Sequence, residues 1–299
     1  MTYSAILPLI DTHTHFDDPV FDADRVKQLI LAKRVGVQHL LLVGYLKCHF
    51  NRLFDVQKQI QQQVQNCGEQ CDNPSSLQAH VALGLHPVYI DQHSDEDLQY
   101  LADNLGSQDE IIAVGEIGLD TYTSELKTVG NYAKQQRYFT AQLDMAVQRQ
   151  LPVLLHIRKA HGDALKILKN HAYDAHQLGG IAHSFSGGEQ EAKAFVKLGF
   201  KLGVTGQISN PNAKKLRRAI QAAVATYGVK CLVIETDCPD MTPITALSAD
   251  DTYQRNTPAN LMLVLASLSE LLALPMDELA AQLWQNSVEA LRVNWSIIN

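Results

Sequence analysis

The stretch CLVIETDCP, residues 231–239, is an apolar run that ends in two carboxylates and a proline. A short continuous run of this kind is typical of a strand buried on both faces of a parallel sheet. It is the last of eight such runs along the chain. The predicted strands are residues 9–15, 39–44, 79–87, 111–120, 151–158, 180–188, 201–207 and 231–239.

Longer segments with helical periodicity lie between the apolar runs. The clearest are residues 22–36, 95–106 and 131–150, and residues 257–293 are expected to form two helices. Repeated strand–helix units with right-handed crossovers form either an open sheet or a closed barrel. The count of eight favours an α/β (β/α)8 TIM barrel, which typically needs about 250 residues. The 299 residues show no linker, so we expect a single domain over residues 1–299.

Composition narrows the class of protein. Hydrophobic residues make up 46% and charged residues 19%, as in an ordinary globular chain. No run approaches the roughly 20 apolar residues of a membrane span, and the N-terminus MTYSAILPLI lacks the basic start of a signal peptide. We therefore expect a cytoplasmic protein with no membrane association and no obligate protein partner. The net charge of −7 argues against a broad basic face for nucleic acid.

The five cysteines do not indicate a disulfide framework, because their number is odd and the chain is long. Cys67 and Cys71 lie in the polar segment Gln57–Gln78, which is expected to extend the second helix and then form a loop. A weak metal pair and a redox pair are alternatives for these two residues. Ordinary loop thiols are favoured, because no second cysteine pair accompanies them.

Polar residues interrupt six of the apolar runs near their carboxyl ends. In a barrel these ends share one rim, so side chains more than 200 residues apart in sequence would meet there. Burying such groups without partners is costly, and a shared divalent metal removes that cost. The interrupting residues are His13, His15, His86, Glu116, His156, His183, Glu235 and Asp237.

Each of these residues also has an ordinary structural explanation. A lone histidine at a strand end is more often hydrogen-bonded than a metal ligand, and Glu116 is a candidate for an ion pair with Arg158. The joint pattern favours a metal site, and six ligands are too many for one tetrahedral catalytic ion. Two ions bridged by Glu116 suit the set. One ion is assigned to His13, His15 and Asp237, and the other to His156 and His183.

Two divalent ions about 3.5–4 Å apart activate a water and clamp both reacting oxygens of a phosphodiester. Asp237 is expected to orient that water and to accept its proton, so Asp237 and Glu116 are the predicted catalytic residues. Histidine and carboxylate ligands leave the metal open among Zn, Mn, Mg, Fe and Ni.

Two further residues are candidates for contact with the substrate. His86 precedes Pro87, which holds its backbone extended, and a phosphate hydrogen bond and a structural hydrogen bond are equally open for it. Arg158 lies two residues after His156 and faces the same side of a strand. A phosphate contact is its functional role, and a salt bridge to Glu116 or Asp120 is the alternative.

Eight ordered motifs run along nearly the whole chain: DTHTHFDD, LGLHP, VGEIGLD, QLDMAVQRQLPVLLHIRKA, HSFSGG, LGVTG, IETDCPDM and RNTPANL. Together they resemble the TatD family of metal-dependent deoxyribonucleases. The resemblance implies a (β/α)8 barrel with two metals, metal-dependent hydrolysis of DNA phosphodiesters, and often exonuclease action from the 3′ end. Asp240 and Met241 depart from the aromatic residue and leucine of many relatives. Matched by position, the resemblance implies the metal ligands His13, His15, Glu116, His156, His183 and Asp237.

Three functions follow from these observations. A two-metal phosphodiesterase or deoxyribonuclease is favoured, and the acidic balance points to DNA in short single strands or to another short phosphodiester. An amidohydrolase that cleaves a C–N or carboxyl ester bond is the second. Many such relatives bridge their metals with a lysine on the fourth strand, where this chain has Glu116 and no lysine. A non-catalytic scaffold is the third, and the presence of all six ligands counts against it.

Overall fold

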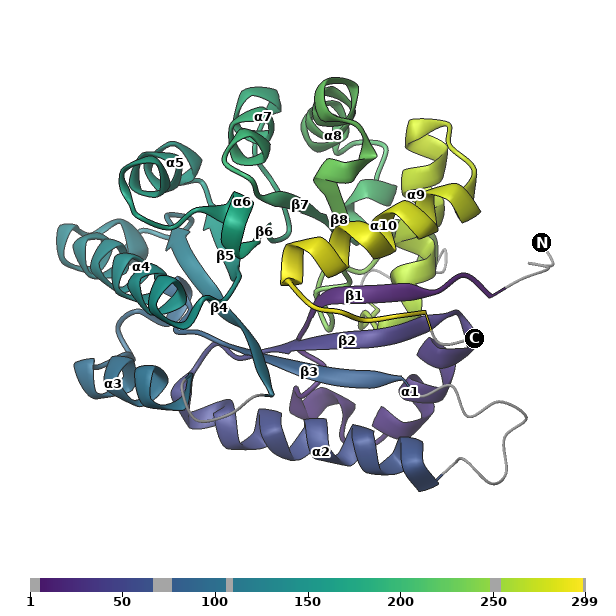
Figure 1. The fold of residues 1–299 in the computed structure, drawn as a ribbon, viewed down its shortest axis with the longest axis horizontal. Helices are drawn as coiled ribbons and strands as arrows, with labels where there is room; N and C mark the ends of the chain where they lie inside the picture. The colour runs from purple at the N-terminus through teal and green to yellow at the C-terminus, as the bar shows by residue number, and fades with distance from the viewer. Residues whose placement is uncertain (1–5, 67–76, 106–109, 248–253, 298–299) are drawn as a thin grey trace.

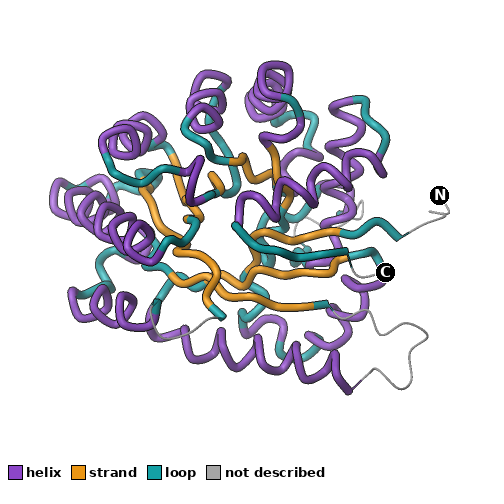
Figure 2. Tube along the Cα trace, viewed as in Figure 1, coloured by secondary structure: helices purple, strands orange, loops and turns teal. Residues whose placement is uncertain are grey.

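The computed structural model describes residues 6–66, 77–105, 110–247 and 254–297, and these form an eight-stranded parallel sheet in the order β1 to β8. Helices surround the strands (Figures 1 and 2), so the predicted α/β TIM barrel is confirmed. The strands are β1 Leu9–Thr14, β2 Val37–Val43, β3 Gln78–Leu83, β4 Ile111–Asp120, β5 Val153–Arg158, β6 Ile181–Ala182, β7 Lys201–Val204 and β8 Leu232–Ile234. The α-helices are α1 Arg25–Arg34, α2 Phe50–Asn66, α3 Asp95–Asn104, α4 Val129–Arg149, α5 His161–Asn170, α6 Ala175–Leu178, α7 Glu189–Lys197, α8 Lys214–Tyr227, α9 Leu261–Leu272 and α10 Met276–Leu291.

The segment after β8 pairs with β1 and nearly closes the barrel. The backbone N–H of Asp237 donates to the carbonyl of His13 at 2.9 Å, and that of His15 donates to the carbonyl of Cys238 at 2.8 Å. Buried Asp11 on β1 accepts hydrogen bonds from the backbone N–H and the hydroxyl of Thr236, at 2.9 and 2.6 Å. Residues from opposite ends of the chain are thereby held side by side.

Alternate residues of each strand face two different apolar layers, as the period of 2 requires. On β2, Leu41 and Val43 belong to the cluster inside the barrel, whereas Leu40 and Leu42 belong to the layer between strands and helices. Helix α10 contributes Ala290 to the inner cluster, and the Ala290 carbonyl accepts a hydrogen bond from the residue just before β6. The amino end of the barrel is therefore packed by α10, and polar groups gather at the carboxyl end.

Strands β6 and β8 are shorter than the sequence predicts. The backbone adopts left-handed conformations at Ser184 (φ 42°) and Asp237 (φ 54°), which ends the extended geometry shortly after each strand. The predicted extension of the second helix is present as far as Asn66. Cys67 and Cys71 lie outside the described residues.

Across the described ranges, no single helix has the length and apolar character needed to cross a membrane. Residues Pro258–Leu272 and Met276–Leu291 pass that test only as a pair bent by 112°.

Candidate metal centre

Glu116 is the centre of the polar cluster at the carboxyl rim. It lies on β4 and is 2% exposed. Its Oε2 is 3.3 Å from Nε2 of His13 and 3.5 Å from Nε2 of His15. Its Oε1 is 2.7 Å from Nδ1 of His156 and 3.1 Å from Nε2 of His86. The two oxygens of one carboxylate therefore face two separate groups of imidazoles.

Asp237 faces the same groups from the segment that follows β8. Its Oδ1 is 3.8 Å from Nε2 of both His13 and His15, and its Oδ2 is 3.5 Å from Nε2 of His183. The same His183 nitrogen is 3.7 Å from Oε1 of Glu116. The six residues predicted as metal ligands thus converge on one small region, although they come from β1, β4 and β5 and from the residues just after β1, β6 and β8.

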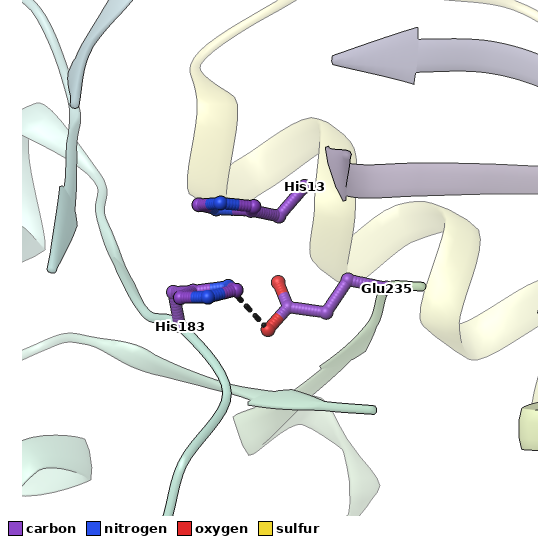
Figure 3. A group of neighbouring side chains, drawn as sticks. All are labelled: His13, His183 and Glu235. Atoms are coloured by element: carbon purple, nitrogen blue, oxygen red, sulfur yellow. Dashed lines mark ion pairs between the residues drawn. The ribbon is translucent and has the colours of Figure 1, made fainter. Parts of the chain in front are cut away.

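Glu235 lies beside His183, and Figure 3 shows it together with the stacked rings of His13 and His183. The rings of His13 and His183 stack with centroids 3.4 Å apart, and Oε1 of Glu235 is 2.9 Å from Nδ1 of His183. The same Oε1 accepts a hydrogen bond from the backbone N–H of Ser184 at 2.6 Å. A Cβ on Gly203 would lie 2.2 Å from Oε1, so glycine makes room for this carboxylate. The sequence placed Glu235 at the rim but did not reveal that it orients His183.

Hydrogen bonds on the far side of other rings fix which nitrogen faces the centre. Nδ1 of His15 is 2.9 Å from the carbonyl of Val43, so it donates there and leaves Nε2 unprotonated when the ring is neutral. Nε2 of His156 is 2.9 Å from Oδ2 of Asp120. Such partners orient metal-binding imidazoles and raise their basicity. Asp120 was predicted only as a possible partner of Arg158, so its contact with His156 is a new finding.

His86 makes the structural hydrogen bond that the sequence left open. Its Nδ1 accepts from the backbone N–H of Val88 at 3.0 Å, which leaves the proton on Nε2. That nitrogen donates to Oε1 of Glu116 at 3.1 Å. Burial lowers the pKa of His86 to about 4, so the ring is neutral near pH 7. His86 also lines a cavity of 360 Å³ above the cluster, so contact with a substrate remains sterically open.

Arg158 lies at the exposed end of β5 and also lines this cavity. Its guanidinium carbon sits 3.6 Å from the ring centroid of Tyr122. Within the described residues Arg158 forms no ion pair with Glu116 or Asp120, so the predicted alternative of a salt bridge is wrong. The guanidinium remains available to an anion in the cavity.

The electrostatics of the cluster favour a cation at its centre. Burial raises the pKa of Glu116, but the surrounding histidines, His86 and His13 first, outweigh it and hold the pKa well below its usual range. Burial lowers the pKa of His15, but Glu116 outweighs it and raises that pKa to about 9. Near pH 7 the protonated histidines, such as His15 and His156, thus balance buried carboxylates, whereas His86 stays neutral. A divalent cation supplies the same positive charge and leaves the imidazoles neutral, the form in which they bind metals, so the donor set fits such an ion.

The family described as "TatD related DNase" matches residues 10–292 of the sequence. The chain belongs to the TatD family. It is 35% identical over 283 residues to a protein of Escherichia coli K12 named "Uncharacterized metal-dependent hydrolase YjjV", covering 94% of this chain and 97% of the relative. A protein of Cronobacter turicensis named "3'-5' ssDNA/RNA exonuclease TatD" is 27% identical over 267 residues, covering 88% of this chain and 89% of that protein.

Solved structures agree with this assignment. The crystal structure of the YjjV TatD homologue from Escherichia coli superposes with a TM-score of 0.79 at 33% identity, over 97% of this chain and 100% of that one. The phosphotriesterase homology protein of Escherichia coli, at 13% identity and a TM-score of 0.65, shares the barrel fold. The protein is therefore a metal-dependent hydrolase of the TatD family.

Two buried glutamines of α4 hold the loops of the TatD-family site in place. Gln142 accepts a hydrogen bond from the backbone N–H of Leu85 at 2.7 Å, and its amide donates to the Leu85 carbonyl at 3.3 Å. Gln135 accepts from the backbone N–H of Asp120 at 2.8 Å. These roles were not predictable from the local sequence, because the rotation of α4 against the strands decides which glutamines are buried.

Gln142→Leu should lower the free energy of unfolding by about 1–3 kcal/mol, because it leaves the buried Leu85 N–H and carbonyl without their partner. Guanidinium-induced unfolding of the metal-free protein measures the change. Gln148→Leu is the matched control, since Gln148 is exposed on the same helix. Equal stability of the Gln142 variant and the parent would contradict the positioning role.

Proposed function

We propose that this metal-dependent hydrolase is a two-metal phosphodiesterase acting on DNA or on short phosphodiesters, with exonuclease-like action from the 3′ end. The observation that carries the proposal is that the two carboxylate oxygens of Glu116 face different histidines: Oε2 faces His13 and His15, and Oε1 faces His156. A carboxylate placed in this way suits a bridge between two ions. The exonuclease name of the Cronobacter turicensis relative supports nucleic acid as substrate.

The ligands divide into two groups around Glu116. His13, His15 and Asp237 would hold one ion, since their donor atoms face one another across 3.4–3.8 Å. His156 and His183 would hold the other, on the side of Oε1. Bound there, two divalent ions lower the pKa of water and neutralise charge on the reacting phosphate.

The chain's own groups complete the reaction site. Asp237 reaches both ligand groups through its two oxygens, and it is placed to orient a water and take its proton. Arg158, free of an ion pair within the described residues, would bind a phosphate oxygen from the wall of the cavity. His86 donates its one N–H, on Nε2, to Glu116 and would hold that carboxylate in place, while its ring lines the cavity that would receive the substrate.

Removal of metal should abolish turnover. After dialysis against a chelator, the protein should lose hydrolysis of bis-p-nitrophenyl phosphate and of single-stranded DNA, and a divalent ion should restore both. A lactone and a dihydropyrimidine serve as substrates for the amidohydrolase alternative. Cleavage of either one without cleavage of a phosphodiester would overturn the proposal, and no turnover of any of the four would favour a scaffold.

A further inference from the structure

Two exposed cations, the cavity-lining Arg158 and its neighbour Lys159, share one tyrosine ring. The guanidinium carbon of Arg158 lies 3.6 Å, and Nζ of Lys159 4.5 Å, from the ring centroid of Tyr122. Tyr122 itself is 48% exposed. Contacts of this kind stabilise each cation weakly at a surface. They fix the position of the two charges without neutralising them.

The backbone brings these two neighbouring residues to the same side. Successive residues of a strand point to opposite faces, but β5 ends at Arg158 and Lys159 has a left-handed backbone with φ 57°. This conformation is uncommon for a lysine. Within the described residues the structure gives neither side chain an ion pair or hydrogen bond. Nearby Asp120 is engaged with His156 and the backbone N–H of Tyr122.

The opposite wall of the cavity carries the other sign of charge. Asp18 follows β1 and Asp240 follows β8, and both line the cavity with Arg158. In the ring of eight strands, β5 lies four positions from β1 and so across the barrel. An extended anion is therefore repelled on the side of Asp18 and attracted on the side of Arg158.

We propose that Tyr122, Arg158 and Lys159 form a binding site for the phosphodiester chain of a short single-stranded nucleic acid. The chain would leave the cavity across the carboxyl ends of β4 and β5, and the terminal nucleoside would lie toward Asp18 and Asp240. The cleavage at this site rests on the proposed function, but binding of the strand does not. Because the net charge is −7, a polyanion needs local positive charge, and these two cations would supply it beyond the reacting phosphate.

Binding of a fluorescent hexadeoxynucleotide with phosphorothioate linkages, measured on the metal-loaded full chain, tests the site. Lys159→Ala and Tyr122→Leu should each weaken binding about five- to tenfold. Tyr122→Phe should bind the strand as tightly as the parent, because phenylalanine keeps the ring. Lys159→Ala should also reduce the slope of log K against log salt by about 0.7. The control is Lys230→Ala, an exposed lysine just before β8 at the other end of the barrel.

Unchanged affinity and salt slope in Lys159→Ala, equal loss in Lys230→Ala, or no binding by the parent would each overturn the site. Competition by tripolyphosphate at the same phosphate concentration would assign the site to free polyphosphates instead. Hydrolysis of bis-p-nitrophenyl phosphate, which has no chain beyond its one phosphate, should be unchanged in Lys159→Ala. If the parent binds the strand by this pattern but hydrolyses no phosphodiester, the proposed function fails and the binding site stands.

Discussion

Glu116→Ala should yield protein that retains little metal and turns over phosphodiesters at least about 10³-fold more slowly than the parent. Loss of a residue that only orients a ligand typically costs about 10–100-fold in metal affinity or activity. Glu116 faces both ligand groups directly, so its loss should cost more. Elemental analysis of the purified variant and kcat/KM for bis-p-nitrophenyl phosphate measure the two effects.

Glu110→Ala is the matched control for this variant. Glu110 is an exposed glutamate immediately before β4, the strand that carries Glu116 near its other end. The control should keep parental metal content and activity. Full metal content in Glu116→Ala, or cleavage of DNA at the parental rate, would refute the bridging role. Circular dichroism of both variants separates these outcomes from a loss of fold.

Much of this site was predictable because its residues lie at the carboxyl ends of the predicted strands. His13 and Asp237 are 224 residues apart, yet each ends an apolar run, and a parallel barrel brings all such ends to one rim. The topology alone thus places these side chains together. It needs only the strand count and the strand direction, which the pattern of apolar runs supplies.

The partners of those residues were not predictable in the same way. The contact of Asp120 with His156 depends on the stagger of β4 against β5. The contact of Glu235 with His183 depends on where β6 and β8 end on either side of β7. Gln142 depends on how α4 is rotated against the barrel. The stagger of the strands and the rotation of the helix are set by packing of the whole core, so the local sequence pattern does not predict them.

Of the two cationic residues at the rim, the sequence predicts the position of Arg158 but not that of Lys159. The spacing from His156 placed Arg158 on the face of the cavity, which the structure bears out. Strand alternation would send Lys159 to the other face. Its left-handed backbone instead turns it toward Tyr122, and no residue type in that stretch signals the turn.

Asp237→Asn should lower kcat for phosphodiesters by about 10²–10⁴-fold, the usual range for loss of a general base. Asparagine is the informative substitution because it tolerates left-handed backbone better than most residues, and Asp237 has φ 54°. It keeps the shape of the side chain but removes its charge and its capacity to take a proton. The backbone pairing of residue 237 with His13, which helps to close the barrel, is unaffected.

Asp240→Asn supplies the control, since it removes the same charge from an exposed carboxylate that lines the same cavity. It should leave hydrolysis of bis-p-nitrophenyl phosphate within about twofold of the parent, as is usual for a residue outside the reacting centre. Burial raises the pKa of Asp237, but His183 and the other histidines outweigh it and lower the net value, so the parent carboxylate is ionised throughout the neutral range. A parental kcat in Asp237→Asn would therefore show that the proton goes elsewhere, and Glu116, which also faces both groups of ligands, would be the next candidate to accept it.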